Sequence, residues 1–211
     1  MTENELQELI RKYHVPKHVM AHMKKVAAVS LFLGEKLHRA GEKINQTLLR
    51  QAALLHDILK LCDFPQLDLT YFDQDVTAEE IQFWSQLIKS CHAKGHVQAA
   101  YEVLMELGEP VLAHMVKKHR FGSLINVKEK PLTWEEKILY YADKRVLHDR
   151  IVSIAERLKD GKKRYFPDGN IPENDGPVEK ALYELEKELL TPAGLKPEEI
   201  TEEAVSHVFY P

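Results

Sequence analysis

Apolar residues recur with helical spacing along most of this chain, and this restricts the folds open to it. Between residues 16 and 38 the steps are three, four and seven residues, which place the apolar side chains on one face of a helix: Val19, Val26, Val29, Leu33 and Leu37. No segment alternates apolar and polar residues between turn signals, as a half-buried strand would. The sequence therefore predicts an all-α fold with negligible sheet content.

Capping residues and helix breakers mark the ends of further helices. Thr77 with Glu80, and Thr133 with Glu136, have the spacing of a capping box, and Asn45 is a suitable N-cap. After the helix over 16–38, the predicted helices cover residues 46–62, 77–91, 95–107, 110–118, 133–159 and 178–190.

The length and composition fit one globular domain. The chain has 211 residues, of which 44% are hydrophobic and 29% charged, close to the averages for folded proteins. We expect a helical bundle over residues 1–160 and a C-terminal helical extension over 178–211 packed on the same domain. Residues 161–177 between them are rich in glycine and proline, so they predict a loop or lid.

Charge and targeting features predict a soluble cytoplasmic protein. The net charge of -4 gives no overall attraction to nucleic acid or to an anionic membrane. The most apolar stretch, residues 26–33, is far shorter than the about 20 residues that span a bilayer. Cys62 and Cys91 match no metal or redox spacing, so a disulfide scaffold is not expected. Nothing in the sequence indicates the oligomeric state.

Four polar residues occupy positions where the helical pattern predicts burial. His22 lies on the apolar face of its predicted helix, and His56 and Asp57 stand within an apolar run at residues 52–59. Asp143 follows a similar apolar segment. One buried histidine is usually a core residue with a hydrogen bond, but a buried carboxylate is costly unless it is paired or binds a metal.

Taken together, these four residues favour a metal site. Three predicted helices would bring imidazole nitrogens and carboxylate oxygens to one interior point. Such ligands suit a divalent or trivalent transition metal ion: Fe, Mn, Co, Ni or Zn. The set contains no thiolate, which argues against a closed structural zinc site.

The order His22, His56-Asp57, Asp143 resembles that of the HD-domain metal-dependent phosphohydrolases. The central motif reads Leu-Leu-His-Asp-Ile-Leu-Lys, and the resemblance spans roughly residues 17–159. Leu59 departs from it, because many members have glycine there. The resemblance implies an HD helical bundle in which these four residues hold one metal ion.

Two further segments resemble those that hold a second metal ion in some branches of this family. They are residues 94–100, which contain His96, and residues 116–122, which contain His119. The resemblance implies that both histidines bind a second metal, with Asp57 as a bridging ligand. One or two metal ions per chain are therefore expected.

Within the two-metal branches, the chain looks most like the one that includes symmetrical dinucleoside polyphosphate hydrolases. The segment over residues 136–144 is similar to that branch, whereas Arg120 stands where threonine is common. His92 is an alternative to His96 as the ligand. The remaining histidines, His148 among them, are interpreted as surface or packing residues.

A site of this kind is expected to hydrolyse a phosphoester or phosphoanhydride bond in a nucleotide or other small phosphorylated compound. A metal-activated, bridging hydroxide would attack the phosphorus. The predicted catalytic residues are Asp57, as bridging ligand, and Lys60, one turn after His56. Asp63 and Asp68 are expected to be solvated loop acids. The cations expected to bind substrate are Lys60, Lys118, Arg120 and Arg145.

Three alternatives stay open at this point. The first is a one-metal nucleoside monophosphate phosphatase that uses His22, His56, Asp57 and Asp143 alone. The second is a di-iron oxygenase with a similar ligand count. The third is a non-enzymatic nucleotide-binding module. The sequence does not identify the substrate, because one scaffold carries many specificities on the same ligands.

Overall fold

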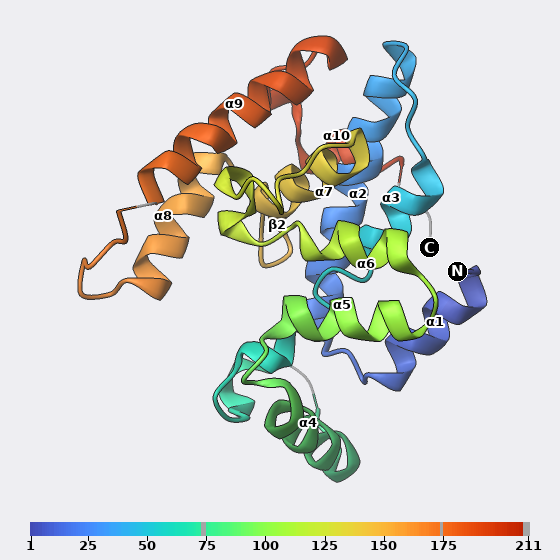
Figure 1. The fold of residues 1–211 in the computed structure, drawn as a ribbon, viewed down its shortest axis with the longest axis vertical. Helices are drawn as coiled ribbons and strands as arrows, with labels where there is room; N and C mark the ends of the chain where they lie inside the picture. The colour runs from blue at the N-terminus through green and yellow to red at the C-terminus, as the bar shows by residue number, and fades with distance from the viewer. Residues whose placement is uncertain (73–74, 174, 209–211) are drawn as a thin grey trace.

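The computed structural model describes residues 1–72, 75–173 and 175–208, and helices dominate it (Figure 1). The α-helices are α1 (Glu3–Lys12), α2 (Lys17–Arg39), α3 (Gln46–Ala53), α4 (Ala78–Cys91), α5 (His96–Glu106), α6 (Pro110–Lys117), α7 (Trp134–Lys144), α8 (Ile154–Tyr165), α9 (Asp175–Ala193) and α10 (Glu202–Val205). Short 3-10 helices are η1 (Lys60–Asp63), η2 (Leu69–Tyr71), η3 (Phe121–Ile125) and η4 (Pro197–Glu199). The all-α prediction is confirmed. None of the described helices is long and apolar enough to cross a membrane.

Helix α2 lies at the centre of the fold and contacts α3, α7, α9 and α10. Val26, Val29 and Leu33 on this helix are fully buried, as their spacing predicts. In Figure 1, α4 lies at one end of the molecule and α9 at the opposite end. Helix α9 contacts α2 and α7, and α10 contacts α2.

The predicted capping residues are present in the structure. Thr77 and Thr133 each accept a hydrogen bond from the backbone N–H of the glutamate three residues later, which completes a capping box. Asn45 caps α3 in the same way. Helix α1 was not predicted, although Thr2 and Glu5 form a capping box at its start.

The predicted helix over residues 46–62 is wrong, because α3 ends at Ala53. The Nδ1 atom of His56 lies 2.8 Å from the Ala53 carbonyl oxygen, which would otherwise accept from the N–H of Asp57 in a continuing helix. Residues 54–59 instead form successive turns with bonds of the tighter i to i+3 type, before η1 begins. The His56-Asp57 pair therefore lies in a turn and not on a helix.

The predicted helix over residues 133–159 is also wrong, because it is two helices. Helix α7 ends at Lys144, and α8 begins after Ser153, which forms a capping box with Glu156. Between them lies a two-residue antiparallel ribbon, β1 (Val146–Leu147) and β2 (Arg150–Ile151). His148 turns the chain there with a left-handed φ of 57°.

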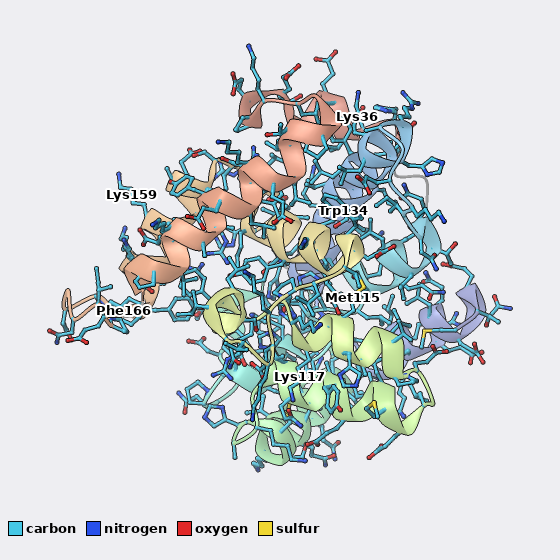
Figure 2. All side chains as sticks on the ribbon, turned by 45° about the horizontal axis from the view of Figure 1, so that its top comes forward. Lys36, Met115, Lys117, Trp134, Lys159 and Phe166 are labelled. Carbon is cyan, nitrogen blue, oxygen red and sulfur yellow. A yellow bond between two sulfur atoms is a disulfide. The ribbon has the colours of Figure 1, made fainter. Side chains whose placement is uncertain are left out.

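The predicted loop over residues 161–177 is shorter than expected. Helix α8 continues through Gly161 to Tyr165, and α9 begins at Asp175. Figure 2 shows Phe166 at the edge of the molecule, where the connection leaves α8. Residue 174 of this loop and residues 209–211 of the predicted extension lie outside the described residues. From 175 to 208 the extension contacts α2, α7 and η3.

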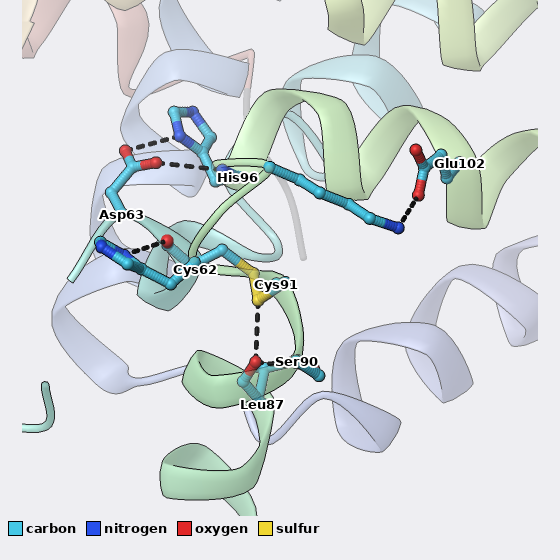
Figure 3. The surroundings of a disulfide bond; sticks show 9 residues. Cys62, Asp63, Leu87, Ser90, Cys91, His96 and Glu102 are labelled. Atoms are coloured by element: carbon cyan, nitrogen blue, oxygen red, sulfur yellow. Dashed lines mark hydrogen bonds and ion pairs between the residues drawn. A yellow bond between two sulfur atoms is a disulfide. The ribbon is translucent and has the colours of Figure 1, made fainter. Parts of the chain in front are cut away.

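The expectation that the chain lacks a disulfide is wrong. Cys62 in η1 is bonded to Cys91 at the end of α4, with the two Cα atoms 5.2 Å apart (Figure 3). The two cysteines are 29 residues apart in sequence, and a motif search gives no sign of such a pair. Their approach depends on the turns after Ala53, which the sequence analysis assigned to a helix.

Candidate metal centre

Three predicted ligands from separate elements meet in a first group. His22 comes from α2, His56 from the turn after α3, and Asp143 from α7. The Oδ1 atom of Asp143 lies 3.1 Å from Nε2 of His22 and 3.6 Å from Nε2 of His56. These ligand atoms are close enough together to hold one metal ion.

The other three predicted ligands form a second group. His96 is the first residue of α5, and His119 follows the end of α6. The Oδ1 atom of Asp57 lies 2.9 Å from Nε2 of His96 and 3.6 Å from Nε2 of His119. The two Nε2 atoms are themselves 3.2 Å apart.

The carboxylate of Asp57 lies between the two groups. While its Oδ1 atom faces His96 and His119, its Oδ2 atom lies 3.9 Å from Nε2 of His22 and 3.8 Å from Nε2 of His56. Each oxygen therefore faces one group. All six predicted ligands consequently belong to one continuous cluster.

The hydrogen bonds of the four histidines fix which ring nitrogen faces inward. Each Nδ1 atom lies 2.6–2.8 Å from an oxygen that can only accept, so Nδ1 carries the hydrogen and donates it. The acceptors are the carbonyl oxygens of His148 for His22, Ala53 for His56 and Val116 for His119, and a carboxylate oxygen of Asp63 for His96.

The inward-facing atoms are therefore the Nε2 atoms, which are left to act as lone-pair donors. Nε2 of His56 is buried and has no hydrogen-bond partner among the residues that the structure describes. The Nε2 atoms of His96 and His119 face each other at hydrogen-bond distance. Buried nitrogen atoms whose free lone pairs face one another need a cation between them. The four imidazole rings and two carboxylates therefore form a ligand set that fits metal ions.

The two carboxylates of the cluster are held in the charged form. Burial raises the pKa of Asp57, but the charges of Lys60, His56 and His96 outweigh it and hold this pKa well below its usual range. Burial likewise raises the pKa of Asp143, but the charge of the neighbouring Lys144 lowers it, and the net pKa lies well below its usual range. Lys144 is itself buried and donates to Asp143 and to the carbonyl oxygen of His119.

His119 and His96 respond to burial in opposite ways. Burial lowers the pKa of His119 to about 4, so its ring is neutral at pH 7. Burial also lowers the pKa of His96, but the negative charge of Asp57 more than compensates and the net shift is upward. A neutral His119 is ready to bind a metal ion, whereas the raised pKa of His96 makes a proton compete more strongly with a metal ion there.

Lys60 is the predicted substrate-binding cation that the structure brings to the cluster. Its Nζ atom lies 3.6 Å from Oδ1 of Asp57 and 3.4 Å from Oδ2 of Asp63, and its side chain is 31% exposed. Burial lowers the pKa of Lys60, but the charges of Asp57 and Asp63 outweigh burial and raise this pKa above its usual value. The amine is therefore charged. This cation lies beside the cluster and still reaches solvent.

The structure places the other three cations differently. Lys118 forms an ion pair with Glu136 at 2.7 Å, and Arg120 is exposed. Arg145 is buried, and its guanidinium donates to carbonyl oxygens and a hydroxyl away from the cluster: those of Val152, Pro197 and Tyr141.

Three residues beside the cluster were not predicted in the roles they have. Asp63 is exposed, as expected, but its carboxylate also holds His96, and the carbonyl of His148 holds His22. Lys144 bonds Asp143. His92, the alternative ligand, belongs to neither group, and its Nδ1 atom lies 3.2 Å from the carbonyl oxygen of Cys62. The carboxylate of Asp68 bonds Thr70.

An all-α fold with a buried histidine and aspartate cluster defines a candidate metalloprotein. The sequence model of one family, the HD domain, matches residues 19–161, about two thirds of the chain, and the chain belongs to that family. Searches of curated proteins and of solved structures found no match. Membership of this family implies metal-dependent activity of the phosphohydrolase type. The matched residues include all six members of the cluster.

Proposed function

We propose that the protein hydrolyses a phosphoester or phosphoanhydride bond in a nucleotide or other small phosphorylated compound. The observation that carries the proposal is the orientation of the four histidines, whose Nδ1 atoms are all engaged and whose Nε2 atoms all face the carboxylate of Asp57. Side chains arranged for packing alone would not leave so many buried acceptors facing one another.

Two metal ions are proposed for the two groups. His22, His56 and Asp143 would hold the first, His96 and His119 the second, and Asp57 would bind both through its two oxygens. Metal ions bound there supply Lewis acidity, which lowers the pKa of a water ligand to about 7. Imidazole and carboxylate ligands accommodate Fe, Mn, Co, Ni or Zn.

The chain's own residues bind and orient the substrate. Lys60 carries a positive charge at the rim of the cluster, where its amine is suited to a phosphoryl oxygen. Asp57 stays ionised and serves as a ligand, because its pKa is far too low for a general base at neutral pH. Lys144 neutralises Asp143 and fixes its orientation.

An assay of hydrolysis products tests this proposal. Protein reconstituted with Mn²⁺ would be offered nucleoside monophosphates, nucleoside triphosphates and dinucleoside polyphosphates, and the products would be separated by chromatography. We expect turnover of at least one class, and loss of both turnover and metal in Asp57→Asn. Asp168→Asn, in an exposed part of the loop before α9, is the matched control and should behave as the wild type.

Full turnover in Asp57→Asn would contradict the proposal. Turnover of monophosphates by protein that holds one metal ion would instead favour the one-metal phosphatase. The products therefore identify the class of substrate, and the metal content of the same protein gives the number of metal ions.

A further inference from the structure

A disulfide bond lies beside the second group of the metal centre. It joins Cys62 in η1 to Cys91, the last residue of α4. Asp63 follows Cys62 directly, and His96 begins α5 five residues after Cys91 (Figure 3). The bond therefore ties together the two chain segments that supply Asp63 and His96.

Asp63 holds His96 at two points, as Figure 3 shows. Its Oδ2 atom lies 2.6 Å from Nδ1 of the ring, and its Oδ1 atom accepts a 3.0 Å hydrogen bond from the backbone N–H of His96. The first contact turns Nε2 of the ring toward Asp57, and the second fixes the start of α5. The position of Asp63 therefore determines the position of His96.

The turn between the disulfide and His96 is short and closely bonded. The backbone N–H groups of Lys94 and Gly95 both donate to the carbonyl oxygen of Cys91, at 2.9 and 3.1 Å. Gly95 has a left-handed φ of 74°, and a Cβ atom there would lie 3.5 Å from Oδ1 of Asp63. A displacement of Cys91 is therefore transmitted to His96 and to its contact with Asp63.

His96 differs from the other histidines of the centre in this dependence. The rings of His56 and His119 donate to carbonyl oxygens three residues earlier in their own segments, and the ring of His22 donates to the ribbon after α7. Only His96, among these four, is oriented by a side chain from another segment. A change at the disulfide should therefore act on the second group and spare the first.

We propose that the Cys62–Cys91 disulfide is a redox-sensitive clamp on the metal centre, and that Asp63 is the positioning residue through which it acts. The inference rests on the proposed function, because it takes the second group as a metal site. In the oxidised protein the bond keeps Asp63 against His96, and the second group binds its metal ion tightly.

Reduction by a dithiol releases the clamp. The S–S bond breaks, Cys62 and Cys91 take up two electrons and two protons as thiols, and the dithiol that supplies them closes into its own disulfide. Leu61, Trp84 and Ile88 form a small apolar cluster that still packs η1 on α4. The reduced segments therefore stay folded, and the clamp loosens without opening fully.

The expected effect is a loss of affinity at one site of two. Removing the partner that orients a metal-binding histidine typically lowers metal affinity about 10- to 100-fold. Because the apolar cluster keeps the segments near each other, we expect the lower end of that range, roughly tenfold, for the second group. The affinity of the first group should not change.

Mn²⁺ binding to the full chain, followed by electron paramagnetic resonance, measures both sites. Wild-type protein is compared in its oxidised form and after reduction with dithiothreitol, and thiols are counted to verify each state. A Cys62→Ser/Cys91→Ser variant reproduces the open clamp without thiols that themselves bind metal. We expect oxidised protein to bind two Mn²⁺ ions and to give the exchange-coupled signal of a Mn²⁺ pair. That signal should be weaker in the reduced wild type and in the double serine variant.

Asp63→Asn tests the route through which the clamp acts. It should lower the affinity of the second Mn²⁺ site in oxidised protein. Adding the two serine substitutions should lower this affinity little further, because both changes act on the same contact between Asp63 and His96. Asp168→Asn, at an exposed aspartate in the loop before α9, is the matched control and should leave both sites unchanged.

Equal affinity for the second Mn²⁺ ion in oxidised, reduced and serine-substituted protein would overturn the clamp and leave the proposed function intact. An unchanged second site in Asp63→Asn would also overturn it. Wild-type protein that binds fewer than two Mn²⁺ ions would overturn the assignment of the second group, and the clamp with it.

Discussion

His96 and His119 face each other across 3.2 Å, yet their rings are expected to hold protons very differently in the metal-free protein. Burial and the charges of His56 and His96 lower the pKa of His119 to about 4 despite its contact with Asp57, whereas Asp57 raises the pKa of His96 above its ordinary value. His96 therefore holds a proton more strongly than His119 does.

The first prediction concerns the pH dependence of these two rings. In metal-free protein, His119 should stay neutral as the pH falls below 6.5 and become protonated only near pH 4, while His96 should stay protonated above pH 6.5. Nitrogen chemical shifts of the labelled rings measure both titrations. Protonation of His119 near pH 6.5 would contradict the assignment.

The sign of each stability effect follows from these directions. The folded-state pKa of His119 lies below its unfolded value, so its contribution to the free energy of unfolding is present above pH 6.5 and lost as the pH falls toward 4. His96 acts in the opposite sense, because its raised pKa stabilises the fold below pH 6.5 and that stability is lost as the pH rises through the raised value.

The second prediction concerns Lys60. Lys60→Gln removes a charged donor near the cluster, and hydrogen bonds to charged groups contribute about 1.5–3 kcal/mol, so kcat/KM should fall roughly 10- to 100-fold. Metal content should stay the same, because the amine is not a ligand. Lys180→Gln, at an 81% exposed side chain on α9, is the control. Loss of metal with loss of turnover would show that Lys60 supports the ligands instead.

Four members of the cluster could be proposed from single residues, and His96 and His119 from the resemblance, but the residues that orient them could not be predicted. His22 and Asp143 stood out because an apolar face is a costly place for a polar side chain, and this is visible in a single helix. Asp63 reaches His96 only through the turns after Ala53 and the turn before α5. No local spacing predicts a contact between residues 33 apart in sequence.

At the scale of elements, the ribbon between α7 and α8 contacts one residue of the site and one buried cation outside it. It turns at His148, whose carbonyl holds His22, and it leads to Val152, whose carbonyl accepts from Arg145. Arg145 also donates to Tyr141 in α7 and to Pro197 in η4. This one guanidinium therefore links three elements.

The third prediction follows from that role. Arg145→Met leaves several buried acceptors without a donor, and such losses at buried charged groups cost about 3–5 kcal/mol. The Tm should fall by roughly 6 °C or more, because about 2–4 °C corresponds to 1 kcal/mol in a domain of this size. KM of the folded protein should not change. Arg120→Met, at an exposed position, is the control. An unchanged Tm with a raised KM would restore Arg145 as a substrate-binding residue.

Element boundaries were predictable where a cap marks them and unpredictable where a side chain interrupts the backbone. The boxes at Thr77 and Thr133 mark the starts of α4 and α7. The end of α3 depends on the His56 ring, which donates a hydrogen bond to the carbonyl oxygen of Ala53, the last residue of the helix. Gly161 suggested a loop, yet the interior of α8 tolerates it, since one glycine costs a helix only about 1 kcal/mol.

At the scale of the whole molecule, the metal centre joins segments that are distant in sequence. Its ligands come from α2, the turn after α3, α5, the end of α6, and α7. Because the unfolded chain presents no such arrangement, metal binding should stabilise the fold.

The fourth prediction is a shift of thermal unfolding with metal. At a free metal concentration of 1,000 times the dissociation constant, binding adds about 4 kcal/mol to the free energy of unfolding. Removal by a chelator should therefore lower the Tm by roughly 8–16 °C, at about 2–4 °C for each 1 kcal/mol. Calorimetry with and without Mn²⁺ measures this shift. Equal Tm values in the two samples would contradict a metal centre that spans the core.

Metal content per chain tests the central claim most directly. Protein purified without a chelator or a metal-affinity step would be analysed for transition metals, in parallel with His119→Ala and with His114→Ala, whose histidine lies on α6 outside the cluster. We expect two metal ions per chain in the wild type and in His114→Ala, and one in His119→Ala. Two ions in His119→Ala, or none in the wild type after reconstitution, would contradict it.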